Sequence, residues 1–187
     1  MTQPTSSPSK TGRLVLFNGP PSTGKTSLVD ELQHQLNDPW FHLSLDDFRS
    51  GIAGQWWLAD DGQLFDRVMT SYLGSLHAMV VAGLDVMAET VITPSRRRLY
   101  ETTFGEIPIT LIGVMCPLEV AIDREGARSD RHRGPIDLDA DAYAAVHTGL
   151  SYDTQIDTAK EGPSELARAL ALHFDRLRSS SFRSHLT

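Results

Sequence analysis

The segment GPPSTGKT, residues 19–26, constrains the fold of this chain more than any other part of the sequence. It follows an apolar run of strand length at residues 13–18 and precedes an amphipathic run, so it joins an expected strand to an expected helix. The spacing fits G-x-x-x-x-G-K-[ST], the pattern of a phosphate-binding loop. Its two glycines allow consecutive backbone N–H groups to point at phosphate oxygens, and the positive N-terminus of the helix adds to the attraction. The sequence therefore predicts a nucleoside triphosphate site of the P-loop type.

The lysine and the first threonine after the second glycine have separate expected roles. Lys25 is expected to reach the β and γ phosphates, and Thr26 to offer its hydroxyl to Mg²⁺. ATP and Mg²⁺ are the expected cofactors; the chain has no Asn-Lys-x-Asp guanine-reading motif, but GTP stays open as a second donor. The expected nucleotide contacts of the loop are Gly19, Pro20, Pro21, Ser22, Thr23, Gly24, Lys25, Thr26 and Ser27.

Apolar runs of strand length alternate with helical patterns along the chain. One expected helix lies within residues 62–83. Its apolar residues recur at intervals of three and four and are Phe65, Val68, Met69, Tyr72, Leu73, Leu76, Met79 and Val80. Strands that alternate with helices predict a three-layer α/β fold, a five-stranded parallel sheet with helices on both faces. Ligands bind beyond the carboxyl ends of the strands in such sheets, so the residues that follow each strand are the candidates for chemistry. The expected strands are residues 13–18, 41–45, 84–89, 109–116 and 152–157.

Composition limits the possible partners. A chain of 187 residues with 40% hydrophobic residues is expected to form one domain, residues 13–177, between a disordered N-terminus at 1–12 and a flexible tail at 178–187. The net charge of −7 argues against a nucleic-acid or membrane-surface partner. No leader or membrane-spanning stretch is present, so a cytoplasmic location is expected, and a homo-oligomer stays open. The single Cys116 excludes an intramolecular disulfide and is expected to be a buried thiol.

Two aspartates, Asp46 and Asp47, follow the second expected strand. Phosphoryl transfer requires an acceptor hydroxyl that is aligned with the γ phosphate and a group that accepts its proton, and a carboxylate at the end of a strand can serve both needs. Asp46 is therefore the expected base. The alternative is that either aspartate caps a helix that begins near Phe48, and this applies more strongly to Asp47.

Later polar residues extend the candidate site. Glu89 ends the third expected strand and is a candidate to hold Mg²⁺ through water or to face the acceptor; a structural hydrogen bond is the alternative. The run DREGARSDRHRG contains Arg124, Arg128, Arg131 and Arg133. We expect Arg128 and Arg131 to lie on a lid that excludes water, against the alternative of a solvated helix face.

Four segments together resemble the chloramphenicol phosphotransferase family of P-loop kinases. They are NGPPSTGKTSLVDEL, WFHLSLDDF, REGARSDR and VHTGLSYDTQIDT, in that order within residues 13–177. The resemblance implies a shikimate- or nucleotide-kinase-like fold with a short lid and transfer of the ATP γ-phosphate to a primary hydroxyl of an antibiotic. It implies that Asp46 is the base, that Arg128 and Arg131 are lid residues, and that Thr158 lies near adenine. His147 in the last segment is equally well explained as a core or helix-end histidine.

The acceptor side departs from that family. Trp56 and Trp57 can wall a pocket for a planar acceptor, or can be one core residue and one lid contact. The arginines at 96–98 can bind an anionic acceptor, or can form a solvated turn. The residues expected to contact the acceptor are Asp47, Arg49, Trp56, Trp57, Glu89, Thr90 and Arg96.

The sequence thus predicts an ATP-dependent phosphotransferase that acts on a hydroxyl of a small molecule, by resemblance an antibiotic. Two alternatives remain open at this point. One is a kinase of an anionic metabolite, nucleotide or nucleotide sugar, which the arginines at 96–98 favour. The other is a nucleotide-binding regulatory protein without turnover.

Overall fold

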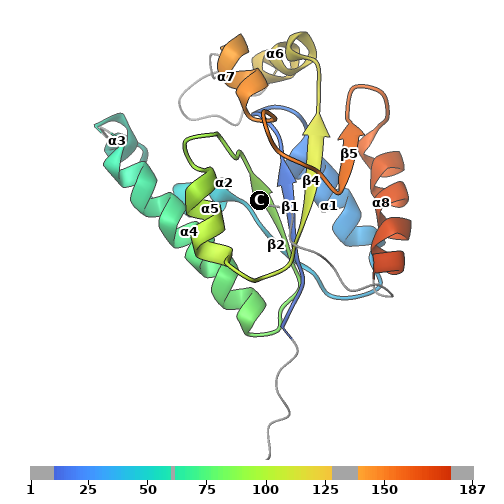
Figure 1. Ribbon diagram of the computed structural model, residues 1–187. Coiled ribbons are helices and arrows are strands. Elements are labelled where there is room, and N and C mark those ends of the chain that lie inside the picture. Colours follow the sequence, from blue (N-terminus) through green and yellow to red (C-terminus); the bar gives the residue numbers. More distant parts are fainter. Residues whose placement is uncertain (1–10, 60–61, 128–138, 178–187) are drawn as a thin grey trace, which may run out of the picture.

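The computed structural model describes residues 11–59, 62–127 and 139–177. A five-stranded parallel sheet, in the order β2-β3-β1-β4-β5, forms its centre (Figure 1). This confirms the predicted sheet, although several strands begin or end one to two residues from the expected positions. The strands are β1 (Leu14–Asn18), β2 (Phe41–Leu43), β3 (Val86–Thr90), β4 (Ile109–Met115) and β5 (Thr154–Asp157).

Helices cover both faces of the sheet, as Figure 1 shows. Helices α4 and α5 lie on one face and α1 and α8 on the other, while α6 and α7 lie beyond the carboxyl ends of the strands. The three-layer prediction is therefore confirmed. The helices are α1 (Lys25–Gln35), α2 (Leu45–Ser50), α3 (Gly54–Leu58), α4 (Gln63–Val81), α5 (Arg97–Phe104), α6 (Leu118–Gly126), α7 (Ala140–Ala145) and α8 (Pro163–Leu177).

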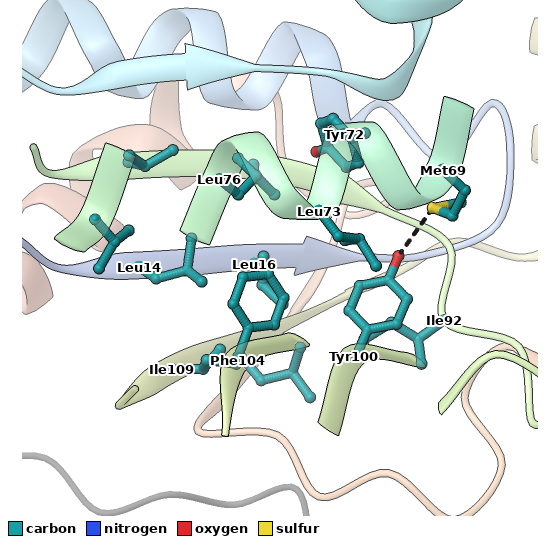
Figure 2. Packing of buried hydrophobic residues seen from close by; sticks show 14 residues of the cluster. Leu14, Leu16, Met69, Tyr72, Leu73, Leu76, Ile92, Tyr100, Phe104 and Ile109 are labelled. Carbon is teal, nitrogen blue, oxygen red and sulfur yellow. Dashed lines mark hydrogen bonds between the residues drawn. The ribbon is translucent and has the colours of Figure 1, made fainter. Parts of the chain in front are cut away.

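Alternate residues of β1 enter two separate cores, because successive side chains of a strand point to opposite faces of the sheet. Leu14 and Leu16 pack under α4 and α5, in the cluster that Figure 2 shows. Val15 and Phe17 pack against α1 and α8, where Trp40 and Phe174 meet edge to face at 5.2 Å. The central strand is thus buried on both faces, which explains its continuous apolar sequence.

Helix α4 presents the face that its sequence periodicity predicted. Val68, Met69, Tyr72, Leu73, Leu76 and Val80 are its buried residues. Phe65 and Met79, the other two members of the predicted stripe, are partly buried against the same cluster. The single cysteine is a free, buried thiol, as expected.

Strand register brings the candidate residues to one edge of the sheet. Asn18, the last residue of β1, pairs with Thr90 on one side and with Gly113 on the other, and Phe17 pairs with Glu89. The phosphate loop therefore begins beside the carboxyl end of β3. Of the ends expected to be mobile, 1–12 and 178–187, only residues 11 and 12 are described.

Candidate active site

The phosphate loop leaves β1 directly and ends where α1 begins at Lys25. Gly24 has a φ of 85°, in the left-handed region that glycine adopts without strain. Gly19 is required for a different reason: a Cβ at this position would lie 2.5 Å from the carbonyl oxygen of Val114. Ser22 also has a left-handed φ, 60°, although it carries a side chain. Both glycines of the pattern thus have a steric function.

The sequence of the loop limits the amides that can bind phosphate. Pro20 and Pro21 lack a backbone N–H, so the donors of the loop begin at Ser22. The buried hydroxyl of Thr23 donates to the carbonyl of Pro20 at 3.0 Å and braces the turn. Ser27, the last predicted contact, is exposed on the first turn of α1.

The Lys25 side chain lies along the loop. Its Nζ donates to the carbonyl oxygens of Gly19 at 2.7 Å and Pro20 at 2.6 Å, and the residue is only 8% exposed. These contacts hold the ammonium at the centre of the loop, where phosphate oxygens are expected to bind.

A chain of polar side chains connects α1, β2 and β3. The Thr26 hydroxyl donates to Glu89 Oε2 at 2.8 Å, and His42 Nε2 lies 2.9 Å from Glu89 Oε1. His42 Nδ1 lies 3.1 Å from a carboxylate oxygen of Asp30. Burial opposes the charge of His42, but Glu89, Asp30 and Asp47 outweigh it and raise the pKa of the imidazole. A protonated His42 can donate to both carboxylates and so fixes Glu89.

The pair of Thr26 and Glu89 fits a magnesium ion by its donor chemistry. Hydroxyl and carboxylate oxygens are the ligands Mg²⁺ prefers, and it commonly takes one or two protein groups together with substrate phosphates. The described residues contain no group of three or more histidine, cysteine or acidic side chains that could hold a metal without such help. Glu89 also makes hydrogen bonds to Thr26 and His42 within the chain. A structural role of this residue is therefore compatible with a role in holding magnesium.

The two aspartates of the sequence analysis belong to a helix rather than to a strand end. Helix α2 begins at Leu45, not near Phe48 as predicted, and Ser44 is its N-cap. The carboxylate of Asp47 accepts from the backbone N–H of Ser44 at 2.8 Å and completes a capping box. Asp46 takes no part in the cap; its side chain is 66% exposed and lies 3.1 Å from Arg49. The predicted base is therefore accessible on the first turn of α2.

The predicted acceptor contacts fall into two groups. Trp56 is 61% exposed on α3, whereas Trp57 is buried and donates from Nε1 to the Arg49 carbonyl. The Arg49 guanidinium lies 5.4 Å from the Trp57 ring. Trp57 is thus a core residue, as the alternative expected of one of the pair, while a lid contact of Trp56 stays a prediction.

On the other side, Arg96 stacks on Phe65 at 4.5 Å, and Thr90 is buried with its hydroxyl bonded to Tyr100. Arg97 donates to the carbonyl of Thr148 at 2.7 Å, while Arg98 is exposed. The side chains of Arg96 and Arg97 therefore have partners within the described residues. The role of each residue toward an acceptor stays a prediction.

Thr158 lies against the phosphate loop. Its hydroxyl donates to the carbonyl of Thr23 at 2.7 Å, and Arg124 donates to its hydroxyl at 3.0 Å and to its carbonyl at 2.8 Å. The neighbouring Glu125, which is 2% exposed, accepts from the Ser22 hydroxyl. The end of α6 is thus attached to the loop at two points. The predicted lid residues Arg128 and Arg131 lie outside the described residues.

Sequence reasoning missed several members of the site, above all His42, Glu125, Asn18 and Tyr152. His42 lies in an otherwise apolar strand, and this unusual position is a signal the sequence offers. Glu125 is part of the charged run DREGARSDRHRG, and the sequence does not show which residues of that run are buried. A hollow of about 610 Å³ lies at the amino ends of the strands, far from this chemistry, and is lined by Thr11, His77 and residues 102–108.

The strand order, the phosphate loop on the central strand and the acidic Glu89 near the carboxyl end of the neighbouring strand define a P-loop kinase fold. Within that class, the chain belongs to the chloramphenicol phosphotransferase-like family, which it matches over residues 12–175. The predicted family is thereby confirmed, and the protein is a phosphotransferase of this group. In the part of the chain that the structure describes, no helix has the length and apolar character needed to cross a membrane.

Relatives and solved structures agree with this assignment. Two Mycobacterium tuberculosis proteins, from strains CDC 1551 / Oshkosh and H37Rv, are named as candidate O-phosphotransferases. Each is 28% identical over 185 residues, which cover 85% of this chain and 80% of theirs. An unliganded sugar kinase from Janibacter has a TM-score of 0.65 at 17% identity and covers 88% of this chain and 95% of its own.

Two further structures share the fold. The tunicamycin resistance protein of Deinococcus radiodurans has a TM-score of 0.62 at 19% identity, over 87% of this chain and 95% of its own. Shikimate kinase from Acinetobacter baumannii has a TM-score of 0.61 at 16% identity, over 89% and 96%. These likenesses show the kinase fold and leave the acceptor open.

Proposed function

We propose that this protein transfers the γ-phosphate of ATP to a hydroxyl of a small molecule, with an antibiotic alcohol as the acceptor class. The observation that carries the proposal is the Thr26–Glu89 hydrogen bond of 2.8 Å at the mouth of the loop that holds Lys25. It combines a phosphate-binding loop with the oxygen donors that a nucleotide-bound magnesium ion requires.

In this proposal Asp46 accepts the proton of the acceptor hydroxyl. The hydroxyl oxygen forms a new bond to the γ phosphorus, the bond between that phosphorus and the β–γ bridging oxygen breaks, and ADP leaves. An exposed carboxylate on the first turn of α2 suits this role, since it can meet an acceptor without moving the helix. Its neighbour Asp47 holds the helix start through the capping box.

The loop amides from Ser22 onward and the Lys25 ammonium are proposed to hold the phosphate oxygens and stabilise their developing charge. Thr26 and Glu89 would hold a magnesium ion, which would neutralise negative charge on the phosphates. His42 keeps the Glu89 carboxylate in place beside Thr26. Arg128 and Arg131 are proposed to close over the phosphoryl group from the lid.

An uncharged acceptor fits the acceptor side better than an anionic one. The Arg96 guanidinium packs over the Phe65 ring and Arg97 donates to the carbonyl of Thr148, so both side chains already have partners within the chain. Trp56 offers an exposed indole face of the kind that packs on apolar or planar ligands. These contacts, together with the family, support an antibiotic alcohol over an anionic metabolite.

The test is a mass-spectrometric screen of the protein with Mg-ATP against chloramphenicol, other hydroxyl-bearing antibiotics, anionic metabolites and nucleotides. Asp46→Asn should bind nucleotide normally and lower turnover of the accepted compound about 10²–10⁴-fold, the range of general-base catalysis. Lys25→Ala should impair both nucleotide binding and turnover. Glu101→Gln, which removes one exposed carboxylate from α5, is the matched control and should behave like the parent.

Each outcome decides a part of the proposal. A phosphate added to an antibiotic and lost in Asp46→Asn supports the whole of it. A phosphate found only on anionic compounds would refute the acceptor class. Full activity of Asp46→Asn would refute the role of that residue, and nucleotide binding without any phosphorylated product would favour a regulatory protein.

A further inference from the structure

The segment Val146 to Tyr152 carries a hydrogen-bonded network that the proposed mechanism does not use. It follows α7 and precedes β5, and it lies over the end of β1. The Asn18 Nδ2 group donates to the Val146 carbonyl at 3.2 Å and to the Tyr152 hydroxyl at 2.7 Å. The Tyr152 hydroxyl lies 2.7 Å from His147 Nδ1. His147 is thereby attached to the residue that precedes the phosphate loop.

The buried Asn18 fixes the direction of each hydrogen bond in this network, because its two side-chain atoms can be told apart. The backbone N–H of Ile92 donates to Asn18 Oδ1 at 2.7 Å, which identifies that atom as the oxygen and Nδ2 as the donor. The Tyr152 hydroxyl accepts from Nδ2, and its own proton remains to be donated. Burial raises the pKa of Tyr152, so the phenol keeps this proton at neutral pH. His147 Nδ1 is therefore the acceptor.

An imidazole that accepts at Nδ1 carries its proton on Nε2 when it is neutral. Burial and the charge of Lys25 lower the pKa of His147, which favours the neutral form. Among the described residues, no side chain or backbone group bonds to Nε2. The network thus holds an N–H donor whose direction is set by its partner nitrogen and which is available to a ligand.

The position of His147 indicates which ligand this donor meets. Lys25 Nζ bonds to the carbonyl of Gly19, the residue directly after Asn18, and Asn18 connects through Tyr152 to His147. The segment is also fixed from the side of α5, where Arg97 donates to the Thr148 carbonyl at 2.7 Å. The charge of Lys25 also acts on His147, so the imidazole lies near the phosphate-loop ammonium.

We propose that His147 donates a hydrogen bond from Nε2 to the γ-phosphoryl group of the bound nucleotide, as a neutral partner to Lys25. This inference rests on the proposed function. A neutral donor beside an ammonium adds a hydrogen bond to phosphate without adding a like charge that would repel Lys25. Tyr152 and Asn18 are positioning residues that keep the proton on Nε2.

The test compares the binding of two nucleotide probes by calorimetry. Mg-AMPPNP carries a γ-phosphoryl group, whereas Mg-ADP does not. His147→Asn places an amide where Nδ1 stands and loses the Nε2 donor; His147→Gln restores a donor near Nε2. The matched control is His34→Asn, on the exposed side of α1.

We expect His147→Asn to weaken Mg-AMPPNP about tenfold, the order of one hydrogen bond to a charged acceptor, and to leave Mg-ADP within about twofold. His147→Gln and His34→Asn should stay near the parent for both probes. Equal losses for both probes would show that His147 supports the fold only. A Gln variant weaker than the Asn variant would show that the Tyr152 bond is what matters, and unchanged affinities would exclude the bond to phosphate.

A second measurement does not depend on any variant. Nitrogen NMR of the histidine rings in the parent protein should show the proton of His147 on Nε2, with a shift that changes on addition of Mg-AMPPNP more than of Mg-ADP. A proton on Nδ1, or identical changes with both probes, would overturn the inference. If the parent binds neither nucleotide, the proposed function itself fails; if it binds both and only the His147 results are negative, the proposed function stands.

Discussion

Ser22 combines a backbone conformation that disfavours side chains with a side chain that makes a buried contact. Its φ of 60° costs a non-glycine residue on the order of 1 kcal/mol. Its hydroxyl donates to Glu125, a carboxylate that is 2% exposed. A buried carboxylate requires donors, so this contact offsets the strain in the loop.

Two substitutions of Ser22 separate the strain from the contact. Ser22→Ala keeps the strained backbone and removes a donor from a buried carboxylate, so we expect the free energy of unfolding to fall by about 2 kcal/mol. Ser22→Gly also removes the donor but relieves the strain, so its loss should be smaller by about 1 kcal/mol. Urea denaturation of both variants measures the difference. A glycine variant less stable than the alanine variant would contradict this account.

Asp46 and Asp47 show how adjacent identical residues acquire different functions. Asp47 is the third residue of α2 and reaches back to Ser44, whereas Asp46 is directed away from the cap. The sequence favoured capping by Asp47 and catalysis by Asp46, but it placed the helix start three residues too late. The N-cap Ser44 was the residue that would have located the start correctly.

Strand β4 is shaped by the network that holds His147. A Cβ at Gly113 would lie 2.8 to 3.0 Å from ring atoms of Tyr152, so the strand can accept that ring only at a glycine. Gly113 also pairs with Asn18 across the sheet. The absence of a side chain at Gly113 therefore allows the Tyr152 ring to pack against β4.

We expect Gly113→Ala to lower the free energy of unfolding by about 1–3 kcal/mol, the cost of overpacking, because the Tyr152 ring must move. Gly74→Ala is the matched control. No atom lies within 4 Å of a Cβ at this position in α4, so the alanine should stabilise the helix by about 0.5–1 kcal/mol. Thermal unfolding of the two variants provides the comparison. Equal effects of the same sign would show that the Tyr152 contact does not limit β4.

At the scale of the whole molecule, the pKa values of two histidines at the active-site edge are shifted in opposite directions. Carboxylates raise the pKa of His42, while burial and Lys25 lower that of His147. Both residues lie beyond or near the carboxyl ends of strands. The electrostatic environment at this edge thus differs between the acidic surroundings of His42 and the surroundings of His147, which lies near Lys25 of the phosphate loop.

The lowered pKa of His147 predicts a dependence of global stability on pH. The unfolded chain, with a histidine pKa of about 6.5, takes up the proton before the folded chain does. The contribution of neutral His147 is therefore complete above about pH 6.5 and is lost as pH falls through the folded pKa. The stability difference between the parent and His147→Gln, from urea denaturation, should be constant near neutral pH and shift against the parent below it. A difference that does not change with pH would contradict the lowered pKa.

Much of this fold was predictable because its signals are local. The residues of the phosphate loop are consecutive, and their conformation follows from two glycines and the start of a helix. The periodicity of α4 and the apolar strands predicted a parallel sheet covered on both faces. The contacts of His42 and Asn18 were beyond sequence reasoning, because their partners lie far along the chain.

The sequence by itself determined the nucleotide loop, the alternation of strands and helices, and the family. The tertiary structure alone decided which polar side chains meet. Asn18 and Tyr152 are 134 positions apart, and Thr26 and Glu89 are 63 apart. The physical reason is that such contacts depend on strand order and register, which place the carboxyl ends of β1, β3 and β4 side by side.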